Sequence, residues 1–166
     1  MDTNVYLPLF KQAVDQLDKT QLNQKQLQAE TGVWLDTVIL RIQKQHWANN
    51  PDAKPQTGSA IFFSIWINDD DTREPKLFYN IHALKLRKLN GYVLTSRKFA
   101  DDFREQFNYL KHDWPDVSMN FGPQTLMKGW QPVNLEYLVN DILKIANKFT
   151  EIDFIIDDLL NSRKVI

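Results

Sequence analysis

A run of basic residues near the middle of the chain has the clearest potential for binding chemistry. Its members are His82, Lys85, Arg87, Lys88, Arg97 and Lys98, with no acidic residue between positions 82 and 98. Two strands joined at Asn90-Gly91 would bring these side chains together, beside a helix that starts near Ser96 and whose free N–H groups attract anions. The run predicts a site for a phosphate, a carboxylate or a nucleic-acid backbone. The alternative is a solvated sheet edge, where lysines discourage pairing with another chain.

Large aromatic residues gather in a second segment, at positions 113–133, among several prolines and glycines. Irregular backbone that carries aromatics often contacts ligands or partners. A loop that packs onto the core through its own aromatics is the alternative. From the two segments, the candidate ligand-binding residues are Tyr79, His82, Lys85, Arg87, Arg97, Trp114 and Trp130.

Pro51-Asp52 and Glu74-Pro75-Lys76 match the letters of a metal-dependent nuclease motif. Such a site needs two acidic side chains on a divalent cation and a lysine beside the attacking water. The context argues against it, because Glu74 follows an acidic turn and precedes a proline, which disfavours a position in a sheet ladder. A small hydrolase that uses this set or His82 stays the alternative function.

Other catalytic and cofactor motifs are absent from the sequence. The chain has no Cys, and its three histidines are scattered without the spacing of metal ligands. The residues from Asp69 to Asp71 lack the glycine and glutamate of an EF-hand loop, which favours a solvated turn. No phosphate-binding glycine loop and no nucleophile elbow occur. We therefore expect no metal and no cofactor, and no catalytic residue can be assigned.

The composition is that of an ordinary folded protein. The 166 residues are 43% hydrophobic and 25% charged, with a formal net charge of −1. This balance lacks the long-range attraction of a dedicated nucleic-acid or membrane binder, although a local basic face keeps nucleic acid open as a partner. The absence of Cys, of a signal peptide and of a long apolar segment predicts a cytoplasmic protein with no membrane contact.

Periodicity predicts the elements that would position these residues. An N-terminal helical part covers 5–31, in which the glutamine-rich stretch either continues the first helix or starts a second one that ends at Gly32, and a sheet region covers 33–95. Within it, 61–67 and 77–83 alternate as an antiparallel hairpin. Helix and strand patterns compete at 33–47, where the β-branched run from Thr37 to Ile39 favours a strand. A helix at 96–111 and a loop or strand at 113–133 follow.

An apolar stripe marks the C-terminal helical region, 134–161. From Leu135 to Leu159 the apolar residues are spaced by three and four, which matches coiled-coil heptads and predicts a homodimer through this region. Apolar residues at adjoining positions widen the stripe and favour packing on the chain's own core instead. Asn134 is the expected helix cap, and Thr150 with Asp153 predicts a break into two helices near Phe149.

Together these patterns predict a single α+β domain over residues 1–166. We expect a mostly antiparallel sheet of three to five strands, with N- and C-terminal helices packed on it. Two functions follow. The first is a non-catalytic binding or regulatory module for an anionic ligand or a protein partner. The second is the small hydrolase, so the sequence leaves open whether the protein is an enzyme.

Overall fold

The computed structural model describes residues 2–68 and 74–165 and contains one antiparallel sheet with helices packed on it. The strands are β1 (Gln28–Trp34), β2 (Thr37–Gln43), β3 (Ala60–Asn68), β4 (Lys76–Leu84) and β5 (Thr125–Pro132). The helices are α1 (Thr3–Gln16), α2 (Lys19–Gln24), α3 (Ser96–Phe107) and α4 (Leu138–Asn161), with short 3₁₀ helices at Gln45–Trp47, Leu86–Lys88 and Asn108–Asp113. The strands lie side by side in chain order. The predicted α+β class is confirmed.

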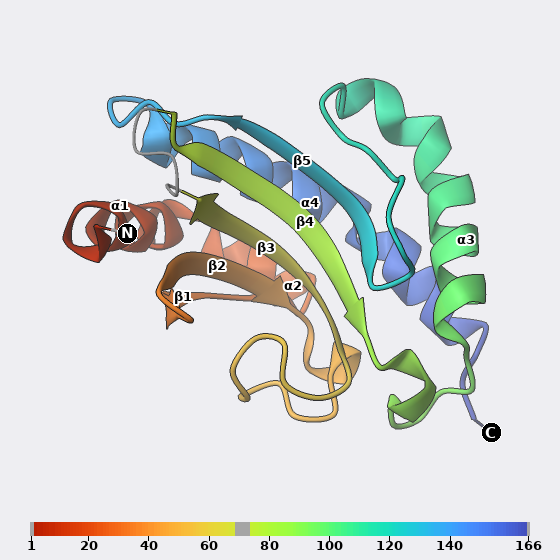
Figure 1. The fold of residues 1–166 in the computed structure, drawn as a ribbon. Coiled ribbons are helices and arrows are strands. Elements are labelled where there is room, and N and C mark those ends of the chain that lie inside the picture. Colours follow the sequence, from red (N-terminus) through yellow and green to blue (C-terminus); the bar gives the residue numbers. More distant parts are fainter. Residues whose placement is uncertain (1, 69–73, 166) are drawn as a thin grey trace.

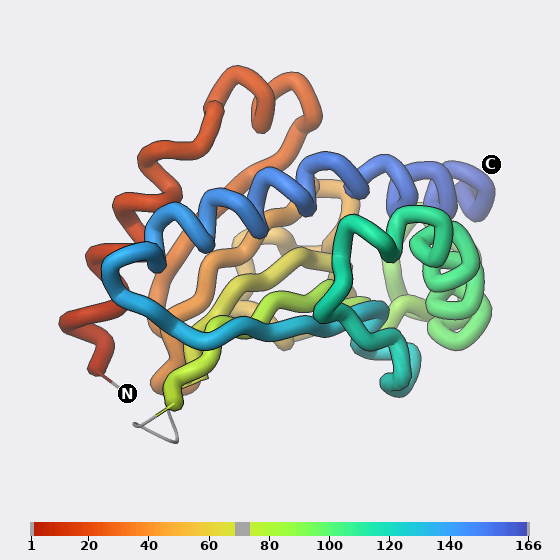
Figure 2. The backbone as a smooth tube through the Cα atoms, turned by 90° about the horizontal axis from the view of Figure 1, so that it is seen from above, coloured from red at the N-terminus to blue at the C-terminus, as the bar shows by residue number. Residues whose placement is uncertain are grey.

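All the long helices lie on one side of the sheet. In Figure 1 the long helix α4 passes behind the strands, and the view from above in Figure 2 shows it running the length of the sheet. Helix α1 lies at the β1 end and α3 at the β5 end (Figure 2). The opposite face of the sheet, which is turned to the viewer in Figure 1, carries no helix from the described part of the chain. We call it the open face.

Strand alternation decides which side chains reach each face. In β3 and β4 the odd-numbered residues from Ile61 to Ile67 and from Leu77 to Ala83 are buried under the helices. Phe63 stacks on Phe149 of α4 with ring centroids 4.6 Å apart, which identifies this as the helix side. The even-numbered residues therefore point to the open face, because successive side chains of a strand alternate. The predicted hairpin is confirmed.

Helix α4 buries its apolar stripe within the chain. From Leu138 to Leu160 the stripe packs in the common hydrophobic core, whereas Leu135 and Phe154 are exposed. The break predicted near Phe149 is wrong: α4 is continuous, and the Thr150 hydroxyl donates to the Asn147 carbonyl of the preceding turn instead of capping a new helix.

The helix also starts later than expected. Tyr137 occupies the N-cap position, and Asn134 instead accepts a hydrogen bond from the Glu136 N–H in the preceding turn. A homodimer through 134–161 stays a prediction, and it would have to use residues outside the buried stripe.

In the N-terminal half, the predicted helix end at Gly32 is wrong, and the choice between helix and strand at 33–47 is decided. A second helix does start in the glutamine-rich stretch, but this helix, α2, ends at Gln24 and not at Gly32, and Gln28 begins β1. Strand β1 is half exposed and pairs only with β2, so its own sequence shows no apolar stripe. The ambiguous segment 33–47 is mainly strand, with the end of β1 and all of β2 before a short 3₁₀ helix, as the β-branched residues favoured.

The hairpin expected at Asn90-Gly91 does not form. After β4 the chain enters the 3₁₀ helix Leu86–Lys88, and Tyr92 makes only an isolated bridge to Lys164 near the C-terminus. In the segment 113–133, predicted as loop or strand, Thr125–Pro132 form the strand β5, and Ser118 makes an isolated bridge to Lys128. The acidic turn at Asp69 to Asp71 lies outside the described residues. Within the described part of the chain, no helix has the length and apolarity needed to cross a bilayer.

Candidate functional site

Three cross-strand pairs form the centre of the open face. Between β3 and β4, Ser64 lies opposite Asn80, and this polar pair has an aromatic pair on either side. The flanking pairs are Phe62 with His82 and Trp66 with Phe78. Ser64 and Asn80 are buried, so each must find hydrogen-bond partners inside the protein.

The amide of Asn80 connects the three pairs. Its Oδ1 accepts hydrogen bonds from Ser64 Oγ at 2.7 Å and from Trp66 Nε1 at 3.0 Å. Its Nδ2 lies 3.0 Å from His82 Nε2. An indole N–H can only donate, so the Asn80 atom next to Trp66 must be the oxygen, and Nδ2 must face His82. His82 Nε2 is therefore an acceptor, and the proton of the neutral ring is on Nδ1.

His82 is held in its neutral form. Its ring stacks on Phe62 with centroids 4.6 Å apart. Burial, and secondarily the positive charge of Lys128, lowers the pKa of His82 to about 4. Protonation of Nε2 would also set an N–H group against the amide N–H of Asn80. At neutral pH the ring is thus an uncharged hydrogen-bonding group.

A small pocket opens on this part of the face, and we call it the open-face pocket. Its volume is about 140 Å³, comparable to cavities of about 150 Å³ that hold one benzene ring. No charged side chain of the described residues lines it. The lining residues are Trp34, Leu35, Thr37, Ile39, Pro55, Gln56, Phe62, Ser64, Trp66 and His82.

Trp34 reaches the pocket because Gly32 leaves room for its ring. A Cβ placed at Gly32 would lie 3.2 Å from the Trp34 ring, which is tighter than ordinary contact. The indole therefore lies against the β1 backbone on the same face. The pocket thus has tryptophans from two different strands in its wall.

The loop over the pocket is anchored by Arg41. This side chain is buried on β2, pairs with Glu30 across the strand, and donates to the carbonyls of Ala53 at 2.7 Å and Pro51 at 3.0 Å. The same loop contributes Pro55 and Gln56 to the pocket. Arg41 consequently acts as a positioning residue whose charge is paired with Glu30 and whose guanidinium holds the loop.

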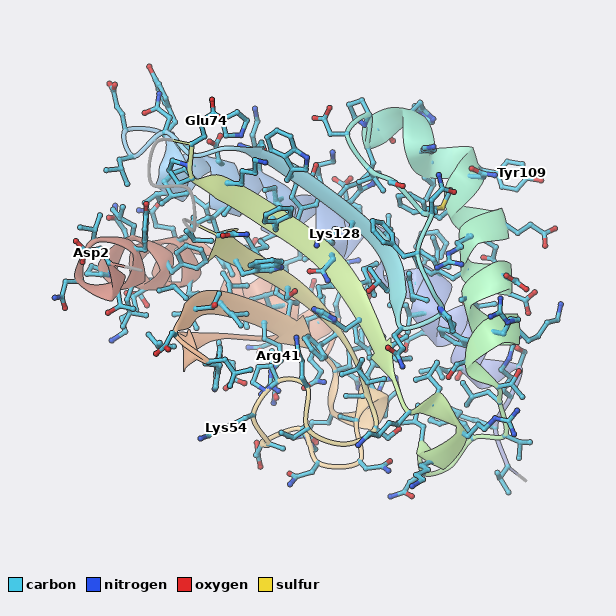
Figure 3. The ribbon with its side chains drawn as sticks, viewed as in Figure 1. Asp2, Arg41, Lys54, Glu74, Tyr109 and Lys128 are labelled. Carbon is cyan, nitrogen blue, oxygen red and sulfur yellow. The ribbon has the colours of Figure 1, made fainter. Side chains whose placement is uncertain are left out.

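Lysines and aromatic rings alternate next to the pocket. Lys128 of β5 has its ammonium 4.6 Å from the centroid of Phe78 and 5.3 Å from that of Trp66. Figure 3 shows Lys128 on the face turned to the viewer. Trp130 of β5 lies opposite Phe78 of β4 and is 45% exposed. The ammonium of Lys76 lies 4.5 Å from the centroid of the Trp130 ring. Such cation–π contacts keep a lysine over the rings while its charge stays available.

The predicted ligand-binding residues are distributed over three places. His82 and Trp130 are on the open face, whereas Tyr79 and Trp114 are buried on the helix side with ring centroids 6.1 Å apart. Burial, with the charge of Asp116 second, raises the pKa of Tyr79 to about 12, so its phenol stays protonated. The exposed residues Lys85, Arg87 and Arg97 follow the end of β4 and line none of the hollows described here.

Sequence reasoning missed three residues that line the pocket, Trp34, Ser64 and Trp66, and two that lie beside it on the open face, Asn80 and Lys128. A signal was available for two of them. Ser64 and Asn80 are small polar residues at equivalent positions inside two otherwise apolar strands. Polar residues there must pair with each other or with a ligand.

The nuclease-like motif is not assembled on one surface. Glu74 precedes β4, and Figure 3 shows it at the opposite end of the sheet from Lys54, two residues beyond Asp52. Among the residues that the structure describes, no three His, Asp or Glu side chains are placed to hold a metal ion.

A second polar cluster joins β2 to α4 on the helix side. Lys44 Nζ lies 2.8 Å from Asp153 and also binds Asp157, whose other oxygen accepts from Trp47 Nε1 at 2.8 Å and contacts His46 Nε2 at 2.7 Å. Burial opposes the charge on Asp157, but hydrogen bonds from Lys44, Trp47 and His46 outweigh it and hold the pKa of Asp157 below its ordinary value. All of these polar groups are used in holding α4 to the sheet.

Comparison with protein families, with curated proteins and with solved structures finds no match to this chain.

Proposed function

We propose that the protein is a non-catalytic binding module whose open-face pocket takes a flat ring carrying an anionic group. The observation that carries the proposal is a pocket with two tryptophans and no charged residue in its wall, beside a lysine that has aromatic rings as neighbours. The volume matches one aromatic ring. Aromatic walls with a few placed polar groups are typical of small-molecule sites.

The polar groups of the pocket favour a ligand with an acceptor atom. His82 uses Nε2 for Asn80, so its remaining nitrogen is a donor. Ser64 donates its only proton to Asn80 and keeps a lone pair. An oxygen or nitrogen acceptor on the ring would satisfy the His82 donor, and a donor on the ring would satisfy the Ser64 lone pair, without bringing a charge into the pocket.

The anionic part of the ligand is assigned to Lys128. Its ammonium lies within 5.3 Å of Trp66, which lines the pocket, so a ring in the pocket would place a carboxylate or phosphate substituent near the charge. Partial removal of the lysine from water by the rings strengthens such a contact.

The hydrogen-bond pattern supports binding in preference to hydrolysis. A serine nucleophile requires its hydroxyl to donate to a base. Here the Ser64 hydroxyl donates to the Asn80 oxygen, and His82 Nε2 accepts from the same amide, so the two are not paired. A cytoplasmic location is part of the proposal, since a chain without Cys has no disulfide to form in an oxidising compartment.

Benzoate tests the proposal as the smallest ring with a carboxylate. In NMR titrations we expect the indole N–H signals of Trp34 and Trp66 to shift, with a dissociation constant on the order of 1 mM. The buried Trp47 and Trp114, which lie outside the pocket, serve as internal controls and should not shift.

Removal of the Lys128 charge distinguishes the contribution of the ligand's ring from that of its anionic group. Lys128→Met should weaken benzoate severalfold and leave uncharged benzyl alcohol unchanged. Lys148→Met is the matched control, because Lys148 also lies over a tryptophan, at 4.1 Å from Trp114 on the helix side. Absence of shifts at Trp34 and Trp66, or equal weakening by both lysine variants, would refute the proposal.

A further inference from the structure

The open face repeats its aromatic-plus-lysine arrangement. The first unit is Trp66 and Phe78 with Lys128, next to the pocket. The second is Trp130 with Lys76. Register connects them, because Trp66 lies opposite Phe78 and Phe78 lies opposite Trp130. The rings thus form a row across three adjacent strands, and each end of the row has its own cation.

The two units are close enough for one extended ligand. Adjacent strands are about 4.8 Å apart, so residues on β3 and β5 at one register are separated by roughly 10 Å. Nearby nucleotides of an extended single strand can span that separation. A lone small anion would use the first unit and leave the second without a role.

We propose that the open face binds single-stranded nucleic acid, with one single-ring base in the open-face pocket and a further base against Trp130. This proposal rests on the proposed function and extends it to a polymer. Single-strand binders combine aromatic stacking surfaces with cations along the backbone. Lys128 and Lys76 contact phosphates, and the rings stack on bases.

The size of the pocket predicts which bases bind best. Its volume of about 140 Å³ fits a six-membered ring, and a purine would exceed it. A paired base cannot leave its duplex to enter the pocket without the cost of unpairing. Pyrimidine single strands should therefore bind better than purine strands or duplex.

A carboxylate beside the second unit allows oligonucleotide binding to be distinguished from benzoate binding. Glu74 lines the same hollow as Lys76 and Trp130, so it would repel a phosphate there. Glu74→Gln should tighten oligonucleotide binding about twofold and leave benzoate binding unchanged. The overall charge of −1 also means that the attraction is local and should be weak at physiological salt.

The experiment is fluorescence anisotropy of a labelled oligothymidylate of roughly eight nucleotides, within the site sizes of single-strand-binding domains. Trp130→Ala should weaken binding about tenfold, as expected for one lost base stack. Two phosphate contacts predict a slope of about −1.4 for the logarithm of affinity against the logarithm of salt, and Lys128→Met should reduce its magnitude by about 0.7. Oligodeoxyadenylate and duplex of equal length should bind less tightly.

Comparison ligands show whether the polymer proposal fails alone or together with the small-ligand proposal. If thymidine monophosphate binds as tightly as the oligomer and Trp130→Ala has no effect, the extension to a polymer is wrong and the small-ligand site stands. If inorganic tripolyphosphate binds as tightly as the oligomer, base stacking is wrong. If neither benzoate nor any oligomer binds, both proposals fail.

Discussion

The side-chain amide of Asn80 lies 3.0 Å from Nε2 of His82 and determines which nitrogen of that ring carries the proton. Asn80 is itself oriented by Trp66, whose indole can only donate. One buried amide therefore sets the hydrogen-bonding character of the pocket. The first prediction follows from exchanging this amide for an acid.

Asn80→Asp should raise the pKa of His82 by about 2 from its present value of about 4. The new carboxylate would keep the bonds from Ser64 and Trp66, and its negative charge would favour the imidazolium. NMR titration of the histidine ring signals measures the change. Asn161→Asp, at the exposed end of α4, is the control. A His82 pKa that stays near 4 in Asn80→Asp would show that the amide does not control the ring.

The stability of the protein should depend on pH through His82. Its pKa is about 4 in the folded protein and 6.5 in the unfolded chain, so between pH 4 and 6.5 the unfolded chain binds more protons. The free energy of unfolding therefore rises with pH across this window, and the loss at its lower end is about 3 kcal/mol. Above pH 6.5 the effect disappears.

Urea unfolding between pH 5 and 6.5 measures this effect apart from the carboxylates, which titrate mostly at lower pH. His82→Gln should flatten the dependence. His112→Gln should not, because the side chain of His112 is 73% exposed. Equal slopes in the two variants would contradict the assignment to His82.

Loss of the lysine that joins β2 to α4 should cost about 3 kcal/mol of unfolding free energy. Lys44→Met leaves Asp153 buried without its nearest cation, and breaking one side of a buried ion pair is strongly destabilising. The Lys44→Met, Asp153→Leu double variant should recover part of the loss, since no unpaired charge stays behind at Asp153. Lys98→Met removes an exposed ion pair with Asp102 and should cost far less, because solvent screens the two charges. Similar losses for Lys44→Met and Lys98→Met in urea unfolding would refute the distinction.

Gly129→Ala should destabilise the protein by about 1–3 kcal/mol. A Cβ at Gly129 would lie 2.6 Å from the ring of Tyr79, which is fixed in the core. Gly122→Ala is the control, because a Cβ there meets nothing within 4 Å. Thermal unfolding compares the two. The Tyr79→Leu, Gly129→Ala double variant should lose less than the sum of the single variants, and strict additivity would mean that the two residues do not clash.

The protein should sediment as a monomer if the C-terminal stripe packs only within the chain. Phe149 of that stripe is buried against Phe63 and Trp114, whereas Phe154 on the same helix is 48% exposed. Phe154→Ser should leave both the sedimentation coefficient and the stability unchanged. A wild-type dimer that dissociates in Phe154→Ser would establish self-association through α4.

The sequence predicted best those elements that bury a regularly spaced set of apolar side chains. Strands β3 and β4 and helix α4 bury continuous apolar sets, so their periods are visible in the residues alone. Prediction failed for β1 and β5, which form the two edges of the sheet. An edge strand has one paired neighbour and mixed exposure, so the polar start of β1 and the glycine and proline of β5 resembled helix and loop.

The basic run and the binding face illustrate the same limit. His82 was a candidate from the sequence because of the lysines and arginines that follow it. In the structure, β4 ends after Leu84 and those residues leave the face, while His82 joins Phe62, Ser64 and Asn80 instead. Position along the chain cannot show this, because a strand's neighbours are set by pairing with other strands.

The sequence by itself determined the α+β class, the central hairpin and the apolar character of the C-terminal helix, since each depends on periodicity within one segment. Only the tertiary structure decided that Trp34, Trp66 and His82 share a pocket, and that Lys128 and Lys76 lie along one row of rings. Those relationships depend on register between strands far apart in the chain, which local patterns do not encode.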